Sequence, residues 1–248
     1  MEQRAERELQ VKAVGSAFMK RVFYVFAALA ILSVGISLAG ERIGRILALA
    51  GHTEDTTIHE IVIGNNVLDV PANVIRFERA RRDGIAERLD LYLRWPDMNG
   101  YSAAARDDFN HAHGGKKILF VSFGEQSMSR DMSGRFDPIY RSLIVEPGVP
   151  GQGGTTLYGF KDRSGYVDEV LAVAERSGQA PFVARCLNGE SAQESLAPCE
   201  RDILIGHNLS LSYRFPRELL PGWRALEAAV LATANRYLRT TDTGSYSG

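Results

Sequence analysis

The feature that most constrains this chain is an uncharged, apolar run at residues 22–40, VFYVFAALAILSVGISLAG. A helix rises about 1.5 Å per residue, so this run would reach about 28 Å, close to the hydrocarbon thickness of a bilayer. Lys and Arg accumulate on the cytoplasmic side of a span, and residues 1–21 hold more of them than the segment after the run. The pattern predicts a single-pass helix in a bacterial inner membrane, with a cytoplasmic N-terminus and a periplasmic C-terminal domain.

A cleaved signal peptide is the alternative interpretation of the same run. The triplets SLA before Gly40 and ALA before Gly51 have the small-x-small form of a cleavage site. An N-terminal segment that is long and contains Glu2, Glu6 and Glu8 favours an anchor instead. Both interpretations predict that the folded part is exported.

Four regions follow from this organisation: a cytoplasmic tail at 1–21, a transmembrane helix at 22–40, a juxtamembrane linker at 41–57 and a periplasmic domain at 58–248. The last region is long enough to bury one hydrophobic core. The chain has 29 basic and 30 acidic residues, and this balance excludes the basic face of a nucleic-acid-binding protein.

Alternation of apolar and polar residues dominates the region from 58 to 248 and predicts half-buried strands. The alternation is clearest at 89–95 and 209–215, where every second side chain is apolar. Weaker strand patterns, bounded by turn signals, cover 58–63, 67–70, 118–123, 157–160, 168–174, 182–187 and 201–205.

A terminal helix is predicted after Pro216, with Pro221 near its first turn. Apolar residues recur there at steps of three and four, the spacing of one helix face, at Trp223, Leu226, Val230, Thr233 and Tyr237. We therefore expect an α+β fold: an N-terminal transmembrane helix, then one β-rich, mostly antiparallel domain with the C-terminal helix packed on the sheet.

The two cysteines, Cys186 and Cys199, lie on the side predicted to be exported, 13 positions apart. In an oxidising compartment such a pair, separated by a polar segment, predicts a disulfide that closes a loop between two strands. A redox-active pair usually has CxxC spacing, which favours the structural role.

A metal site is the most specific chemical hypothesis in the chain. On a strand, His111 and His113 would point to the same side, as two metal ligands must, and Asp107 and Asp108 lie close by in sequence. A solvated loop is the alternative, because a glycine- and lysine-rich stretch follows at 114–117 and there is no third histidine nearby.

Two other motifs predict no ligand. The glycine-rich segment at 151–156 lacks the lysine that contacts nucleotide phosphates, so neither a nucleotide nor another cofactor is expected. The arginines between 76 and 82 are interspersed with acidic residues, which is typical of a solvated face with local ion pairs.

Four aromatic residues could form a stacking platform for a sugar, because flat rings pack against sugar faces. Trp95 and Trp223 occupy apolar positions that favour burial in the core, whereas Tyr92 and Tyr101 occupy positions compatible with exposure. A cell-wall polymer is therefore one candidate partner.

Four segments resemble a known group of proteins: VPANVIRFERARRDG at 70–84, LDLYLRWPDMNGY at 89–101, FVARC at 182–186 and YRFPRELLPGW at 213–223. They are similar to segments of uncharacterised bacterial single-pass membrane-anchored envelope proteins. The resemblance implies an anchored envelope protein and assigns no active residues.

The sequence supplies no coherent set of acid, base and nucleophile, which favours a protein that is not an enzyme. We expect a membrane-anchored envelope protein, held in the lipid bilayer by its helix, whose periplasmic domain binds another envelope protein or a cell-wall polymer. The alternative is a periplasmic metal-assisted hydrolase that uses His111 and His113.

Overall fold

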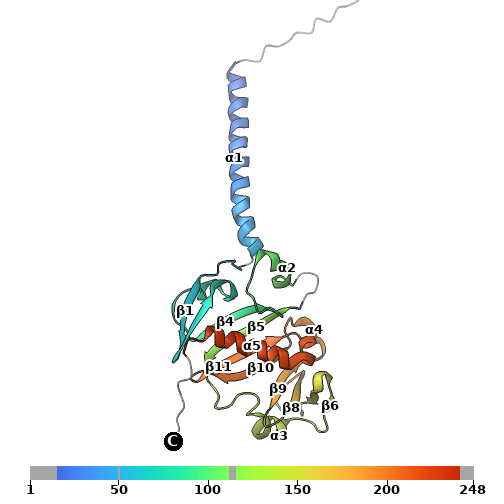
Figure 1. Ribbon diagram of the computed structural model, residues 1–248. Helices are drawn as coiled ribbons and strands as arrows, with labels where there is room; N and C mark the ends of the chain where they lie inside the picture. The colour runs from blue at the N-terminus through green and yellow to red at the C-terminus, as the bar shows by residue number, and fades with distance from the viewer. Residues whose placement is uncertain (1–15, 50, 112–115, 241–248) are drawn as a thin grey trace, which may run out of the picture. The chain divides into compact units, whose positions relative to one another are not determined.

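The computed structural model describes residues 16–49, 51–111 and 116–240, and within the N-terminal helix it describes the side chains of 19–35. The chain divides into two compact units, Met1–Ala50 and Gly51–Gly248. The first unit contains α1 (Ser16–Leu49). The second contains every strand of the described chain (Figure 1).

The predicted membrane topology is wrong. Residues 22–40 are helical within α1, but no helix in the described part of the chain combines the length and apolar character needed to cross a membrane. Such a crossing requires about 20 consecutive, predominantly apolar residues. This finding overturns the single-pass inner-membrane location, with a cytoplasmic N-terminus and a periplasmic domain.

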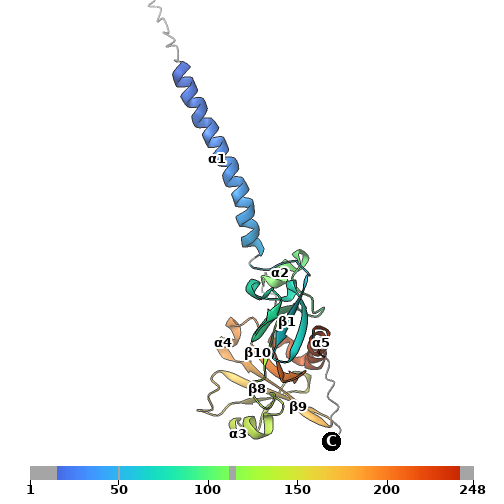
Figure 2. The ribbon, with the colours of Figure 1, turned by 90° about the vertical axis from the view of Figure 1, so that its left-hand side faces the viewer.

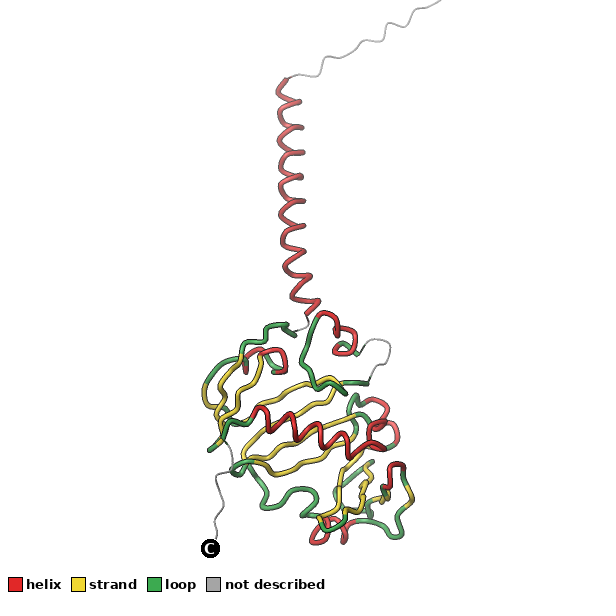
Figure 3. The backbone as a smooth tube through the Cα atoms, viewed as in Figure 1, coloured by secondary structure: helices red, strands yellow, loops and turns green. Residues whose placement is uncertain are grey.

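The remainder of the predicted fold class is confirmed: the second unit is α+β, rich in antiparallel sheet, with a C-terminal helix. Its strands form two sheets, visible as two groups in Figure 3. The larger sheet has eight strands, in the spatial order β4 (Arg88–Arg94), β5 (Ile118–Glu125), β11 (Leu209–Phe215), β10 (Cys199–Ile205), β9 (Gln179–Leu187), β8 (Glu169–Arg176), β7 (Thr156–Gly159) and β6 (Val149–Pro150).

The smaller sheet has three strands in the order β2 (Asn66–Pro71), β1 (Ile58–Ile63) and β3 (Gly84–Ile85). β1 pairs antiparallel with β2 and parallel with β3, which the sequence did not predict because β3 has only two residues. Short helical segments connect the strands: η1 (Ala72–Val74), η2 (Glu78–Ala80), η3 (Ala103–Ala105), α2 (Arg106–Phe109), η5 (Phe136–Tyr140), α3 (Arg141–Leu143), η6 (Gln152–Gly154), α4 (Gly189–Glu194) and η7 (Arg217–Gly222).

The C-terminal helix α5 (Trp223–Tyr237) covers one face of the large sheet. The helix follows the predicted periodicity, and Pro221 lies in the 3-10 turn η7 that directly precedes its first turn. Trp223 stacks on Phe182 of β9, with ring centroids 4.5 Å apart. Burial of one such large apolar side chain contributes about 1.5–3 kcal/mol to the free energy of folding. The apolar face of α5 therefore holds the helix on the sheet.

The opposite face of the large sheet is covered at one end only. Over β8 and β9, a second cluster of buried residues joins the η5–α3 segment to the sheet through Phe136, Tyr140 and Ile144, which pack against Leu171 and Val183. Figure 2 shows α4 and α5 on opposite sides of the sheet. The strands β4, β5 and β11 therefore keep an open, polar face opposite α5.

The large sheet divides into two halves between β9 and β10. These strands pair at two positions, Cys199 with Cys186 and Glu200 with Arg185, whereas β10 and β11 pair at seven. Beyond Glu200 the two strands diverge, and we call this opening the fork. A disulfide between Cys186 and Cys199 spans the point where the fork begins, which confirms the predicted bridge.

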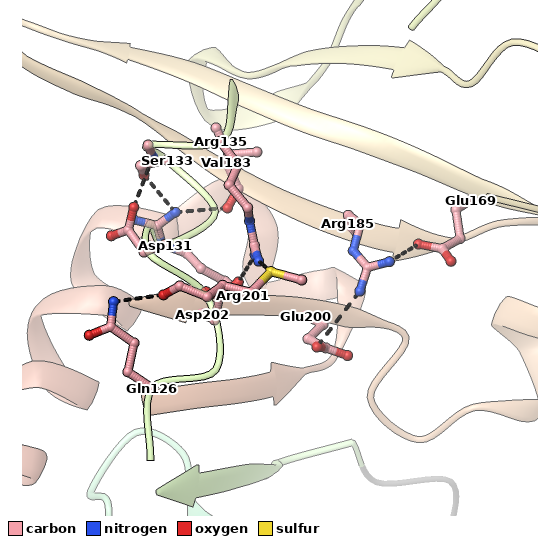
Figure 4. Close-up of polar contacts among 12 residues, drawn as sticks. Gln126, Asp131, Ser133, Arg135, Glu169, Val183, Arg185, Glu200, Arg201 and Asp202 are labelled. Atoms are coloured by element: carbon pink, nitrogen blue, oxygen red, sulfur yellow. Dashed lines mark hydrogen bonds and ion pairs between the residues drawn. The ribbon is translucent and has the colours of Figure 1, made fainter. Parts of the chain in front are cut away.

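The side chain of Arg201 fills the fork. Arg201 is only 1% exposed, and its Nη1 donates hydrogen bonds to the Val183 carbonyl of β9 (2.8 Å) and to Ser133 Oγ (3.0 Å). Its Nη2 donates to Glu227 Oε1 of α5 at 2.9 Å, and Glu227 also pairs with Arg176 of β8. One guanidinium thus joins both halves of the sheet, the helix and the 126–140 segment. Figure 4 shows its contacts with Val183 and Ser133.

Asp202, the next residue of β10, contacts the 126–140 segment from the other side of the sheet. Its carboxylate pairs with Arg135, as Figure 4 shows. Burial raises the pKa of Asp202, and the nearby Arg135 charge offsets part of that rise. Side chains alternate along a strand, so these adjacent residues bind elements on opposite faces of the sheet. Arg201 binds the helix α5, and Asp202 binds Arg135 on the other face.

We predict that Glu227→Ala lowers the free energy of unfolding by about 3–5 kcal/mol, because it leaves the buried Arg201 guanidinium without a counter-charge. Glu60→Ala, which removes a partner from the exposed Arg239 pair, serves as the control and should cost about 1 kcal/mol or less. Denaturant unfolding measures both values. An equal, small effect of the two substitutions would contradict the structural role of the fork.

The segment that begins the second unit is held by an aromatic cluster. The His52 ring stacks on Tyr101 at a centroid distance of 4.7 Å, and its Nδ1 is 2.8 Å from the Tyr92 hydroxyl. Phe109 packs edge-on against all three rings. Burial lowers the pKa of His52, and electrostatic interactions with Arg81 and His111 lower it further. The cluster therefore favours the neutral imidazole.

We predict that acid weakens the attachment of the His52 segment to the aromatic cluster. Because the folded-state pKa of His52 lies below its ordinary value of 6.5, the contribution of His52 to stability is complete above that pH and declines as the pH falls through the folded-state pKa. Denaturant unfolding of the wild type and His52→Gln at about pH 7.5 and about pH 5.5 isolates this residue. The wild type should lose more stability on acidification than the variant; equal losses would contradict the assignment.

Candidate functional site

A groove of ≈ 490 Å³ lies on the open face of the large sheet, opposite α5. Its floor follows one row of residues across three strands, because Asp90 of β4, Ser122 of β5 and Ser212 of β11 are register partners. Serine side chains are short, so this row lies below the longer side chains around it. We call this cavity the sheet groove.

The floor is a hydrogen-bonded polar surface. Ser122 Oγ donates to Asp90 Oδ1 at 2.5 Å and accepts a hydrogen bond from Arg88 Nη2 at 2.8 Å. Arg88 Nε also donates to Asp90 Oδ1, at 2.8 Å. These three side chains therefore satisfy one another, and the Asp90 carboxylate already has its cationic partner.

One wall of the sheet groove comes from the loop that the disulfide closes. Glu194, Ser195 and Leu196 line the cavity from this loop, which leaves β9 after Leu187 and returns to β10 at Cys199. A backbone hydrogen bond from Leu187 N to Pro198 O (2.9 Å) closes its base. The cystine at the start of the fork thus also fixes a wall of the groove.

The basic wall is built around Phe120 of β5. Arg76 lies over the Phe120 ring, with its Cζ 4.9 Å from the centroid, and its backbone N–H donates to Asp90 O at the outer edge of β4. Arg214 of β11 is the register neighbour of Phe120 and contacts Ser195 Oγ at 3.4 Å. The sequence indicated ion pairs for the arginines near Arg76; the structure shows a cation–π contact for this one instead.

A charged cluster continues the groove across β10 and β9. Arg185 lies between Glu200, at 3.8 Å, and Glu169, at 3.4 Å (Figure 4). Burial raises the pKa of Glu169, the Arg185 charge counteracts that rise, and Glu200 adds to it. Glu200 also lines the groove, and its charge is already matched by the guanidinium of Arg185 on β9.

A second cavity, of ≈ 710 Å³, lies between the small sheet, the 94–102 turn and the end of α5. Of its charged side chains, Arg94 pairs with Asp97 and Asp108, Asp69 pairs with Arg239, and Arg236 contacts the Thr233 hydroxyl and the Tyr237 ring. The sheet groove differs, because two of its arginines have no carboxylate partner among the described residues and a disulfide-closed loop forms one of its walls. We take it as the candidate site.

The predicted metal site stays a prediction, because His113 lies outside the described residues. His111 follows the short helix α2, with a positive φ of 53°, and is not on a strand. Asp108, one of the two nearby carboxylates, pairs with Arg94 and Lys117. Within the described ranges, no group of three or more His, Cys, Asp or Glu side chains is placed to hold a metal ion.

The aromatic residues do not form an exposed platform. Tyr92, Tyr101 and Trp223 are buried, and Trp95 is half-buried against the main core. The sequence suggested that the two tyrosines were exposed; their burial has its reason in the His52 cluster, which packs against both rings.

The sheet groove was not identified from the sequence. Its signal was present in two outward positions of the central strands, where Ser122 and Ser212 stand instead of the usual long polar side chains. Small residues at paired outward positions of neighbouring strands indicate a hollow on a sheet face. That pattern becomes visible only when the pairing of β5 with β11 is known, and these strands are about 90 residues apart in sequence.

Comparison with known proteins assigns no family: no family model matches the chain, and no curated protein matches it. Two solved structures resemble it. One is Smlt3025, an immunity protein of the Stenotrophomonas maltophilia type IV secretion system, with 16% identity and a TM-score of 0.49 over 77% of this chain and 96% of that one. The other is the iron-regulated outer membrane lipoprotein FrpD of Neisseria meningitidis, with 10% identity and a TM-score of 0.39 over 73% and 93%. Neither likeness is strong enough to support an argument about this chain.

We predict that reduction of the disulfide lowers the free energy of unfolding by about 3 kcal/mol, because the bond closes a loop of 14 residues in the unfolded chain. The chain has two cysteines, so a reductant acts on this bond alone. The double variant Cys186→Ser/Cys199→Ser should match the reduced wild type, and reductant should not change it. An unchanged melting curve for the reduced wild type would contradict the prediction.

Proposed function

We propose that this chain is a non-catalytic, envelope-associated protein whose β-rich unit binds another protein through the sheet groove. The observation that carries the proposal is the composition of the groove: an open polar floor, a wall fixed by a disulfide, and a basic wall with unmatched charge.

The chemistry of the groove favours binding over catalysis. The Ser122 hydroxyl lies on the groove floor, and its partners are the Asp90 carboxylate and the Arg88 guanidinium. Activation of a serine requires a base within hydrogen-bond reach, most often histidine, and no described residue that lines the groove is a histidine. The Asp90 carboxylate already accepts hydrogen bonds from Arg88 and Ser122 at its Oδ1.

A protein partner fits the groove better than a cell-wall polymer. Sugar polymers are typically bound on exposed aromatic faces, and Tyr92, Tyr101 and Trp223 are buried. The groove instead offers mixed charges, hydroxyl groups and the partly exposed Leu196, a composition typical of the rim of a protein–protein interface.

The disulfide supports the envelope part of the proposal. Disulfides persist in oxidising compartments and are rare where thiols are kept reduced. The Cys186–Cys199 bond also closes the loop that forms a wall of the groove, so the binding surface would depend on that compartment.

We predict that a photo-crosslinking amino acid placed at Leu196, in the groove wall, captures one defined protein in intact cells. The matched control is the same amino acid at Val167, which is 78% exposed and does not line the groove. The capture should disappear when Ser212 is replaced by Trp, which fills the groove floor. A captured protein that is identical from both positions, or capture that survives the Ser212→Trp substitution, would contradict a groove-specific partner.

A further inference from the structure

We infer that Arg76 and Arg214 of the sheet groove form a receptor for a single carboxylate, supplied by an Asp or Glu side chain of the bound protein. This inference rests on the proposed function and names the chemical group that the groove recognises. The juxtaposition that carries it is two arginines next to Phe120, in a groove whose other arginine is already paired: the Arg76 guanidinium lies over the Phe120 ring, and Arg214 is the register partner of Phe120 on β11.

Unmatched positive charge is confined to these two residues within the groove. Arg88 pairs with Asp90, and Glu200 pairs with Arg185. Among the described residues, no carboxylate lies within 4.0 Å of the guanidinium of Arg76 or Arg214, the distance that defines an ion pair here. Arg76 is held by the Phe120 and Phe77 rings, and Arg214 by a long contact to a serine hydroxyl.

Two aromatic rings restrict the side chain of Arg76, an exposed residue, before any ligand binds. Its backbone is hydrogen-bonded to β4, and its guanidinium lies 4.9 Å from one aromatic centroid and 5.1 Å from another. A cation on aromatic faces keeps its N–H donors at the ring edge free for an acceptor. Ordering the side chain in advance reduces the entropy lost on binding, so the site is preorganised for a planar acceptor such as a carboxylate.

The floor supplies a further donor. Ser212 lies between Ser122 and Asp202 in the register, and no hydrogen bond of its hydroxyl to another described side chain is present. Two guanidinium groups and one hydroxyl can together satisfy the oxygens of one carboxylate.

The acidic residues of the groove set an upper limit on the charge of the ligand. Asp90, Glu194 and Glu200 line the same cavity as the three arginines, so its charges balance overall. A dianion such as phosphate would be repelled by these carboxylates more strongly than a carboxylate with one charge. The unpaired Glu194, at the rim, would also attract a basic residue next to the bound acid, as protein surfaces of mixed charge provide.

The test is a titration of the protein with N-acetylglutamate amide, in which NMR monitors the Nε–Hε resonances of the arginine side chains. We expect saturable shifts of Arg76 and Arg214, with a dissociation constant on the order of millimolar, and no shift of Arg224, an exposed control arginine on α5. Arg76→Gln and Arg214→Gln should each weaken binding about threefold to fivefold. The neutral N-acetylglutamine amide should cause no shift at the same concentrations.

Three results would overturn the inference: no shift of either arginine, equal shifts with the neutral amide, or displacement of the glutamate probe by an equal concentration of inorganic phosphate. The photo-crosslink at Leu196 separates this inference from the proposed function. A crosslinked partner that is retained in the Arg76→Gln/Arg214→Gln variant would leave the function intact and remove the carboxylate site. Carboxylate binding without any crosslinked partner would assign the site to a small acid and remove the protein partner.

Discussion

The buried guanidinium of Arg201 is the interaction on which the rest of this fold depends. It occupies the fork where β9 and β10 separate, and it donates to both the Val183 carbonyl and Ser133 on one side and to Glu227 on the other. A buried cation is tolerated only when its donors are satisfied and its charge is matched. The two halves of the sheet, α5 and the 126–140 segment must therefore meet at one place, and this requirement selects a single arrangement of four elements.

The candidate site lies beside the loop that joins β9 to β10. This loop leaves the sheet at the paired ends of the two strands, on the side away from the fork, and it lines the sheet groove. The Cys186–Cys199 bond holds the two strands together where that loop starts. On the same face, the η5–α3 segment covers β8 and β9 and leaves β4, β5 and β11 open. The loop thus supplies a wall of the groove, and the limited reach of the η5–α3 segment leaves its floor uncovered.

Local patterns in the sequence predicted the elements, and longer-range chemistry decided their arrangement. Alternation predicted the strands at 89–95 and 209–215, and helical spacing predicted α5, because burial of one face leaves a periodic trace. Cys spacing predicted the disulfide. Arg201 gave no such trace, since an arginine in an apolar strand position looks like an exposed residue until Glu227 is brought beside it. The apolar run at 22–40 predicted a helix correctly, but its membrane location was wrong.

The most direct test of this account is native-state hydrogen exchange on Arg201→Lys. Lysine keeps the positive charge but cannot reproduce the planar, fixed arrangement of guanidinium N–H donors. We predict that amide protection falls on both sides of the fork, in β9 and β10, and in the 187–198 loop that walls the sheet groove, while β4 and β5 keep the protection of the wild type. Protection that is unchanged in the 187–198 loop, or that falls equally in every strand, would contradict the claim that Arg201 holds the groove in place.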